Sequence, residues 1–277
     1  MSIGDDHRPR RAHRAFAGDA NLTPHLVILG GGQAGYQLAA SAREGGFAGK
    51  VTIIGEEPAL PYQRPPLSKD YLASKIDEEG IVLRPETFYA SHRIDLLMGE
   101  RAIAIDRVGR VVSLASGSVI AYDHLVLALG ARNRTLDVPG AELEGVLSLR
   151  SLADARSLRD WLGAARKLLV IGAGFIGLEI AASAHKRGLE IECLELGPRV
   201  MGRAVSEPMS RFFEGAHRDW GTGFRFNTAA QRMIGHQGRV VAVETREGER
   251  LQADLVVVGV GVVPNTELAS ACGLAVA

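Results

Sequence analysis

Leu26-Val27-Ile28-Leu29 leads directly into Gly30-Gly31-Gly32-Gln33-Ala34-Gly35, and this junction decides how the chain folds. The aliphatic run is too continuous for a half-exposed strand and predicts a buried parallel one. Residues 36–43 favour a helix, which Gly45-Gly46 ends. Residues 51–54 are Val-Thr-Ile-Ile and predict a second strand. The stretch therefore predicts a βαβ unit with a glycine turn between its first strand and its helix.

The second half of the chain repeats this order. Leu168-Leu169-Val170-Ile171 leads into Gly172-Ala173-Gly174-Phe175-Ile176-Gly177, followed by a predicted helix over residues 178–186 and a predicted strand over residues 191–194. Each half then carries a hairpin and a final strand, over residues 101–116 with 123–130 and over residues 240–245 with 254–261. This internal repeat predicts an α/β fold of two doubly wound, Rossmann-like dinucleotide-binding modules with antiparallel β insertions.

The composition is that of an ordinary globular protein. The chain has 277 residues, of which 46% are hydrophobic and 23% charged, and its formal net charge is zero. The length suggests about two domains. The neutral charge does not favour a nucleic-acid partner, and no apolar run approaches the roughly 18 residues of a membrane-spanning helix. We therefore expect neither nucleic acid nor a membrane as a partner.

The first residues and the two cysteines bear on the location of the protein. Residues 1–23 contain four arginines without a following apolar segment, so they predict a disordered tail rather than a secretion signal. Cys193 and Cys272 lie far apart and form no C-x-x-C pair. We interpret them as small buried hydrophobic residues in a reducing compartment, which predicts a cytoplasmic protein.

The two glycine motifs are candidate phosphate-binding turns. A dinucleotide pyrophosphate is anionic, and the N–H groups at a helix N-terminus bind it when no side chain blocks the approach. In the first motif, Gly30 allows the tight turn, Gly32 lets the phosphates approach, and Gly35 lets the helix pack on the strand. The residues that repeat these three roles in the second motif are Gly172, Gly174 and Gly177.

Each motif also needs an acidic residue about 20 residues later to bind a ribose. Glu56 and Glu195 meet this requirement, because each follows or ends a predicted strand. A glutamate repels the 2′-phosphate of NADP, and Leu196-Gly197-Pro198 separates Glu195 from Arg199. The second motif is therefore expected to prefer NAD over NADP.

The stretch Pro61-Tyr62-Gln63-Arg64-Pro65-Pro66-Leu67-Ser68-Lys69 follows the first predicted ribose-binding strand. Its three prolines stiffen the backbone. Arg64 is a candidate to pair with a pyrophosphate, and Lys69 is a candidate to place a charge near a redox ring. Composition alone favours a rigid surface loop with solvated charges.

Taken together, these residues resemble the NADH-dependent ferredoxin reductases of the pyridine nucleotide-disulfide oxidoreductase superfamily. These are FAD proteins that serve aromatic-ring dioxygenases and cytochromes P450, and they are similar to rubredoxin reductases and apoptosis-inducing factor. The resemblance runs from about His25 to the last residue. The segments that carry it are Gly30–Gly35, Glu56, Pro61–Lys69, Leu149–Ala155, Gly172–Glu179 and Gly259–Asn265.

The resemblance implies that residues 24–148 bind FAD and residues 149–268 bind NADH. By position, Ala34 and Glu56 are expected at the ADP half of FAD, and Ala102 at the adenine through its backbone. The residues expected near the FAD phosphates or the flavin are Arg64, Lys69 and Arg150. Glu179 is expected near the nicotinamide, in contact with Lys69. The other cofactor-binding residues that the resemblance implies are Gly130, Phe175, Ile176, Gly259 and Gly261, and no metal site is expected.

The chain departs from the family pattern at two places. The family usually has Ala-Thr-Gly where this chain has Ala128-Leu129-Gly130, which removes one hydroxyl. In the family a second FAD segment with a Gly-Asp pair follows, and then a C-terminal interface domain. This chain stops at Ala277 before both. We therefore expect a C-terminally truncated reductase, in which residues 269–277 begin the missing FAD return segment.

The resulting hypothesis is a flavoprotein oxidoreductase that passes electrons from NADH through FAD to a small iron–sulfur or rubredoxin-type carrier. In it Lys69 stabilises the negative charge that develops on flavin reduction, and Glu179 orients Lys69 and the nicotinamide. A disulfide reductase or NADH peroxidase needs a cysteine facing the flavin, and the stretch Pro61–Lys69 has none. The alternative from another class is a nucleotide-binding fragment that binds NADH, holds FAD poorly and has no reductase activity.

Overall fold

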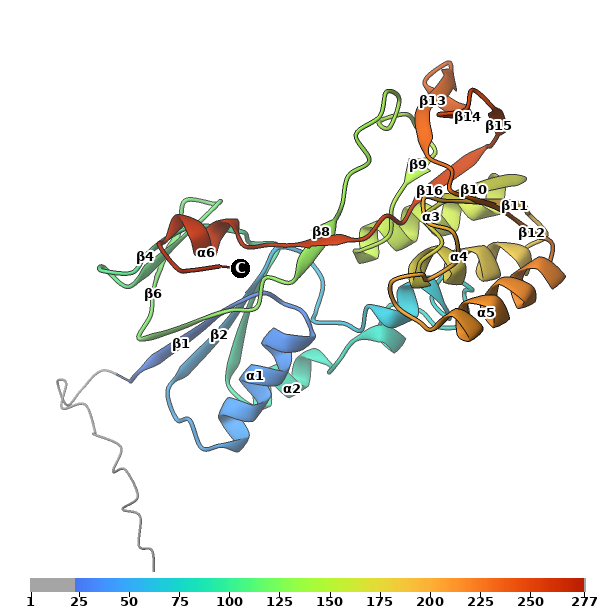
Figure 1. The fold of residues 1–277 in the computed structure, drawn as a ribbon. Coiled ribbons are helices and arrows are strands. Elements are labelled where there is room, and N and C mark those ends of the chain that lie inside the picture. The colour runs from blue at the N-terminus through green and yellow to red at the C-terminus, as the bar shows by residue number, and fades with distance from the viewer. Residues whose placement is uncertain (1–22, 277) are drawn as a thin grey trace, which may run out of the picture.

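The computed structural model describes residues 23–276, so the predicted tail lies, apart from Thr23, outside the described residues (Figure 1). The first parallel sheet has the strand order β3-β2-β1-β7. Its strands are β1 (His25–Leu29), β2 (Lys50–Gly55), β3 (Ile94–Met98) and β7 (His124–Leu127). Helix α1 (Gln33–Glu44) connects β1 to β2, which confirms the predicted βαβ unit.

The second parallel sheet has five strands in the order β12-β11-β10-β16-β9. Its strands are β9 (Val146–Leu147), β10 (Lys167–Ile171), β11 (Glu190–Glu195), β12 (Thr222–Phe226) and β16 (Leu255–Val258). The helices of this half are α3 (Leu152–Ala164), α4 (Phe175–His185) and α5 (Glu207–Asp219). The α/β fold with two doubly wound modules is thus confirmed; the first and second modules below are the parts built on these two sheets.

Each module carries the antiparallel insertion that the sequence predicts, and each insertion has three strands where a hairpin is expected. In the first module these strands are β4 (Ala102–Asp106), β5 (Val111–Leu114) and β6 (Val119–Ala121). In the second they are β13 (Ala230–His236), β14 (Arg239–Thr245) and β15 (Arg250–Gln252). The turn between β13 and β14 places both Gln237 and Gly238 at positive φ, the backbone that a tight hairpin turn requires.

The end of the described chain returns to the first module. Strand β8 (Ala131–Asn133) pairs antiparallel with β17 (Val262–Pro264), and the two form a ribbon between the modules. Helix α6 (Glu267–Ala271) follows and packs near β4, with Leu268 against the apolar core under the first sheet. Figure 1 shows this red segment leaving the second module and ending beside β4 and β6.

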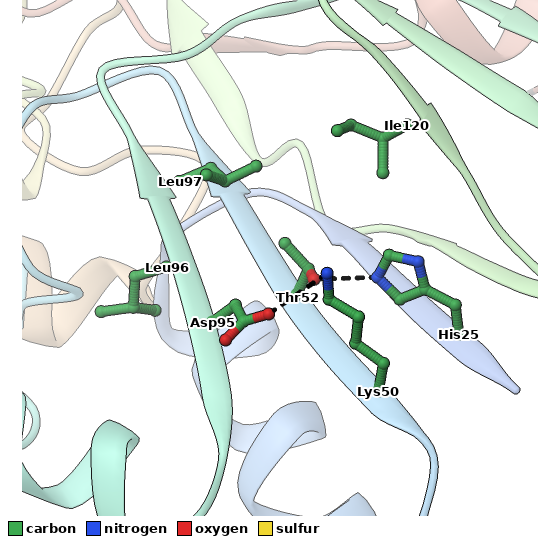
Figure 2. Close-up of a pocket in the computed structure, with 7 residues that line it drawn as sticks. All are labelled: His25, Lys50, Thr52, Asp95, Leu96, Leu97 and Ile120. Carbon is green, nitrogen blue, oxygen red and sulfur yellow. Dashed lines mark hydrogen bonds and ion pairs between the residues drawn. The ribbon is translucent and has the colours of Figure 1, made fainter. Parts of the chain in front are cut away.

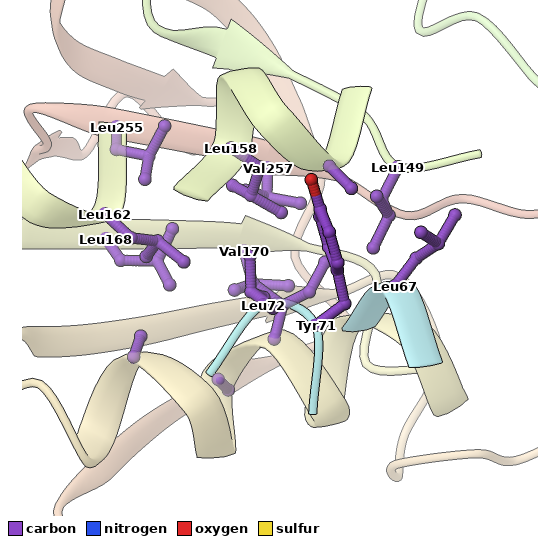
Figure 3. Close-up of a cluster of buried hydrophobic side chains, with 14 of the residues drawn as sticks. Leu67, Tyr71, Leu72, Leu149, Leu158, Leu162, Leu168, Val170, Leu255 and Val257 are labelled. Atoms are coloured by element: carbon purple, nitrogen blue, oxygen red, sulfur yellow. The ribbon is translucent and has the colours of Figure 1, made fainter. Parts of the chain in front are cut away.

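The proline-rich stretch packs against the second module, although it follows a strand of the first. Its 3-10 turn η1 (Pro65–Ser68) buries Leu67 and Ser68 almost completely. Leu67, Tyr71 and Leu72 lie in one apolar cluster with side chains of α3 and β10 (Figure 3). The apolar side of this stretch is therefore buried, whereas the Lys69 side chain is 50% exposed, as the alternative of a rigid surface loop with solvated charges expects. The remaining short elements are η2 (Glu79–Ile81) and α2 (Glu86–Ser91).

The two cysteines differ in burial. Cys193 lies in β11 and is fully buried, and this burial raises the pKa of its thiol. Cys272 follows α6 and is only half-buried, so the predicted burial holds for Cys193 alone. Within residues 23–276, none of the helices has both the length and the apolar character needed to span a bilayer.

Candidate functional site

The first glycine turn lies where the carboxyl ends of β1 and β7 meet. Gly30 has φ +125°, and a Cβ on it would lie 2.1 Å from the carbonyl oxygen of Ala128. A Cβ on Gly35 would lie 1.9 Å from the carbonyl oxygen of Gly30, so only glycine lets α1 sit this close to the strand. A Cβ on Gly32 would meet no atom within 4 Å. The turn is therefore tight on two sides and open at Gly32.

The second turn repeats this geometry residue by residue. Gly172 has φ +101°, and its Cβ would lie 2.6 Å from the carbonyl oxygen of Gly259. A Cβ on Gly177 would lie 2.2 Å from the carbonyl oxygen of Gly172, whereas one on Gly174 would meet no atom within 4 Å. Neither α1 nor α4 has a side-chain cap on its first turn. Both turns thus fit an anionic pyrophosphate, with open space beside uncapped helix N–H groups.

The two predicted ribose-binding glutamates are held differently. Glu195 ends β11, and its two carboxylate oxygens accept hydrogen bonds of 2.8 Å each from the backbone N–H groups of Ala173 and Gly197. Glu56 follows β2, is 75% exposed, and has Arg101 at 4.0 Å. Glu195 is therefore fixed beside the second glycine turn before any ligand binds, and Glu56 is not.

Arg199 is the first arginine after Glu195, and its guanidinium is already engaged. It donates to the carbonyl oxygen of Val205 at 3.1 Å and to that of Gly202 at 2.7 Å. Both acceptors belong to the loop between β11 and α5. The side chain therefore folds back on its own loop.

Lys69 and Glu179 meet between the two modules. The ammonium of Lys69 lies 2.8 Å from Oε1 of Glu179, and the hydroxyl of Ser68 donates to Oε2 of the same carboxylate. Phe175 and Ile176 lie in the first turn of α4, one turn from Glu179, and are 53% and 37% exposed. A small cavity of about 160 Å³ borders the ion pair; its lining residues are Ser68, Lys69, Asp70, Ala73, Lys75, Glu179, Ala182, Ser183 and Lys186.

Arg64 and Arg150 lie together, and both already have protein partners. Arg64 forms an ion pair with Glu57 at 2.6 Å and donates to the carbonyl oxygen of Arg150. Arg150 donates through Nε to the carbonyl oxygen of Ala131 at 2.9 Å, and its Nη2 lies next to Gly130. Burial, and then the charge of Arg64, lower the pKa of Arg150.

Three of the contacting residues, Glu57, Tyr62 and Ser68, are absent from the predicted site. The hydroxyl of Tyr62 donates to Glu57 at 2.6 Å and accepts from the N–H of Leu152 at the start of α3. Burial and the bond to Glu57 raise the pKa of Tyr62. Tyr62 and Ser68 belong to the proline-rich stretch, and that membership is the one sequence signal that points to them.

The remaining predicted residues are Ala34, Ala102, Gly259 and Gly261. Ala34 is an exposed residue of the first turn of α1. Ala102 begins β4, where it is half-buried and pairs with Leu114. Gly259 follows β16 and packs against the second turn, and the carbonyl oxygen of Gly261 accepts a hydrogen bond of 2.9 Å from the N–H of Arg134.

A larger cavity of about 320 Å³ lies at the amino ends of β1, β2 and β3, away from both glycine turns (Figure 2). Its polar groups pair with one another. His25 Nε2 lies 2.8 Å from Oγ1 of the buried Thr52, and the Lys50 ammonium lies 3.5 Å from Asp95. Burial, and then the charge of Lys50, lower the pKa of His25. We interpret this cluster as part of the support of the sheet.

Comparison with known proteins agrees with this geometry. Rhodocoxin reductase of Rhodococcus erythropolis is 49% identical over 251 residues, which cover 91% of this chain and 59% of that protein. Putidaredoxin reductase of Pseudomonas putida is 41% identical over 261 residues, which cover 92% of this chain and 62% of that protein. The crystal structure of a ferredoxin reductase from Rhodopseudomonas palustris superposes with a TM-score of 0.89 at 47% identity, over 91% of this chain and 62% of that one.

These relatives agree with the resemblance inferred from the glycine motifs and the proline-rich stretch. The chain spans about six tenths of the length of the curated relatives that it matches. The family model described as pyridine nucleotide-disulphide oxidoreductase matches residues 24–277. The chain therefore belongs to the pyridine nucleotide-disulphide oxidoreductase family, with ferredoxin and putidaredoxin reductases among its relatives.

Proposed function

We propose that this chain is the dinucleotide-binding part of a flavoprotein reductase that takes electrons from NADH through FAD to a small iron–sulfur or rubredoxin-type carrier. The family implies FAD and a nicotinamide nucleotide, and the names of its relatives indicate the class of carrier. The observation that carries the proposal is the pair of matching glycine turns, with the Lys69–Glu179 ion pair between their modules.

FAD, when bound, supplies an acceptor for the hydride of NADH and a donor of single electrons to the carrier. The residues of the chain supply position and charge. The open turn at Gly32 suits the FAD pyrophosphate, and the open turn at Gly174 suits that of NADH. Lys69 carries a positive charge where negative charge develops on reduction, and Glu179 orients its ammonium. Phe175 and Ile176 offer apolar surface to the nicotinamide.

The second site is proposed to prefer NADH over NADPH. Two backbone N–H groups fix the Glu195 carboxylate, so a 2′-phosphate at this place would meet a negative charge that cannot turn away. Arg199, the nearest arginine after it, is bound to two carbonyl oxygens of its own loop. The site therefore offers a ribose an acceptor, and Arg199 is not free to pair with a 2′-phosphate, although the exposed Arg203 lies four residues further along the same loop.

The test is reconstitution of the purified chain with FAD, followed by gel filtration and anaerobic addition of NADH. We expect yellow protein whose flavin absorbance bleaches with NADH faster than with NADPH. A Lys69→Ala variant should bind FAD and bleach at least about tenfold more slowly, because a charge near the reacting ring is worth a few kcal/mol. Lys69→Arg is the matched control that keeps the charge.

Two results would contradict the proposal. Colourless protein that still binds NADH supports the nucleotide-binding fragment instead. An unchanged rate of flavin reduction in Lys69→Ala removes Lys69 from the proposed mechanism.

A further inference from the structure

Two hydrogen bonds of Ser68 connect turn η1 to helix α4. Leu67 beside it is 1% exposed and anchors the turn in the apolar cluster of Figure 3. The Ser183 hydroxyl donates to the backbone carbonyl of Ser68 at 3.1 Å. One helical turn earlier, Glu179 accepts a hydrogen bond from the Ser68 hydroxyl. Ser68 itself is 5% exposed, so both contacts are largely shielded from water.

The two carboxylate oxygens of Glu179 have different partners. Oε1 lies 2.8 Å from the Lys69 ammonium, and Oε2 accepts from Ser68. The Ser68 hydroxyl also lies 3.5 Å from the carbonyl oxygen of Pro65, but it has a single hydrogen, and the contact with Glu179 is much shorter. The hydroxyl therefore donates to the carboxylate and leaves the other oxygen turned toward Lys69.

The ion pair alone would hold this geometry poorly. The Lys69 side chain is 50% exposed and that of Glu179 is 29% exposed. Attraction between such partly exposed charges is weak, because water screens it and two long side chains must be ordered. A hydrogen bond from a buried hydroxyl to a carboxylate is stronger and more directional. Ser68 is thus the rigid partner in this group of three side chains.

We propose that Ser68 is a positioning residue that fixes the Glu179 carboxylate and, through it, the Lys69 ammonium. The inference rests on the proposed function for its kinetic consequence, since the ion pair has to be placed correctly during transfer of the hydride from NADH. Ser68 does not bind a cofactor in this assignment. It acts through Glu179.

The kinetic test compares Ser68→Ala with two matched variants in the FAD-loaded chain. We expect Ser68→Ala to lower the rate of flavin reduction by NADH about tenfold, because small misplacements of catalytic groups are costly. The Kd for NADH, measured by fluorescence titration, should stay within about twofold. Ser68→Thr should recover most of the rate. Ser183→Ala removes a hydroxyl from the same contact between η1 and α4 and should leave the rate within about twofold. Equal loss in Ser68→Ala and Ser183→Ala, or no loss in either, would overturn the proposal.

A second test needs neither FAD nor activity. Urea unfolding of Ser68→Ala, Glu179→Ala and the double variant forms a double-mutant cycle. If the hydroxyl holds Glu179, the destabilisation by Ser68→Ala should shrink by at least half once Glu179 is alanine. Equal destabilisation in both backgrounds overturns the proposal. The two tests can also disagree. If the cycle shows strong coupling but NADH does not reduce the flavin of the wild-type chain, the proposed function and the kinetic role of Ser68 are overturned, whereas its contact with Glu179 stands.

Discussion

At the scale of single residues, the glycines of each turn have two separate roles, one in packing and one in leaving space for a ligand. Gly35 and Gly177 leave no room for a Cβ, because backbone carbonyl oxygens lie 1.9 and 2.2 Å from its position. Gly32 and Gly174 have open space there, so the fold does not require glycine at these positions. The close contacts serve packing, and the open positions are available to a ligand.

This difference predicts that two alanine substitutions in the second turn have different effects, one mainly on stability and the other mainly on NADH binding. Gly177→Ala should lower the free energy of unfolding by about 2 kcal/mol or more, because the backbone must move to admit the methyl group. Gly174→Ala should cost about 1 kcal/mol or less, since its backbone is extended and its surroundings are open. It should nevertheless weaken NADH binding at least about tenfold, which is about 1.4 kcal/mol.

Urea unfolding and fluorescence titration with NADH measure the two effects. Gly32→Ala is the matched control in the first turn, and it should leave the Kd for NADH unchanged. A Gly174→Ala variant with wild-type affinity for NADH would show that the open space is not used by the pyrophosphate.

At the scale of elements, α5 rests on β12 through a buried histidine. His217 is 4% exposed, and its ring lies 5.0 Å from that of Trp220 and 6.3 Å from that of Phe224. Within residues 23–276, its Nδ1 has no hydrogen-bond partner. Burial, and then the charge of His185 on α4, lower the pKa of His217. Protonation of this ring is therefore less favourable in the folded chain than in the unfolded one.

The sign of this shift predicts a loss of stability in mild acid. Because the pKa of His217 is lower in the folded state, the unfolded state binds the proton first, and stability falls as the pH drops below the unfolded value of about 6.5. His217→Phe should keep the aromatic packing and reduce the difference in unfolding free energy between about pH 7.5 and pH 5. His236→Gln, on the exposed end of β13, is the control. An equal pH dependence in His217→Phe and the wild type would assign the loss to other groups, of which His25 has a pKa shifted in the same direction.

Some elements could be predicted from local sequence, and others could not. Continuous apolar runs predict β1, β10 and β16, because such runs suit strands buried on both faces. Helix α3 is absent from the prediction although Ser151 and Asp154 form a capping box, a signal that the sequence does contain. Strands of two or three residues, such as β9 and β17, carry no periodicity of their own.

The same limit applies to the candidate site. The glycine turns and Glu195 follow from motif spacing, and the structure places them together. The Ser68–Glu179 contact joins residues 111 positions apart, so it depends on how η1 packs against α4. No local pattern in either segment encodes that packing.

At the scale of the whole molecule, the core of the second module includes side chains from the first half of the chain. Residues 59–82, which include the proline-rich stretch, contribute five buried side chains to the apolar cluster of the second module: Tyr62, Leu67, Tyr71, Leu72 and Ile81. Strand β9 also pairs with β16 in the second sheet, although it precedes residue 149. A boundary between residues 148 and 149 follows the sequence repeat, but it divides this core and removes the edge strand of the sheet.

This division predicts that residues 149–268, expressed alone, will not reproduce the second module. Full burial of one large apolar side chain contributes about 1.5–3 kcal/mol, so loss of the five partners removes roughly 7.5–15 kcal/mol of apolar burial. That amount is comparable to the whole stability of a typical domain, about 5–15 kcal/mol.

We expect the fragment to bind a hydrophobic dye, to lack a cooperative unfolding transition, and to bind NADH at least about tenfold more weakly than residues 23–276. Addition of residues 59–82 through a flexible linker should recover part of the cooperativity, because it returns the missing side chains to their core. A fragment of residues 149–268 that unfolds cooperatively and binds NADH as tightly as the longer chain would mean that residues 59–82 only cover a module that is already complete.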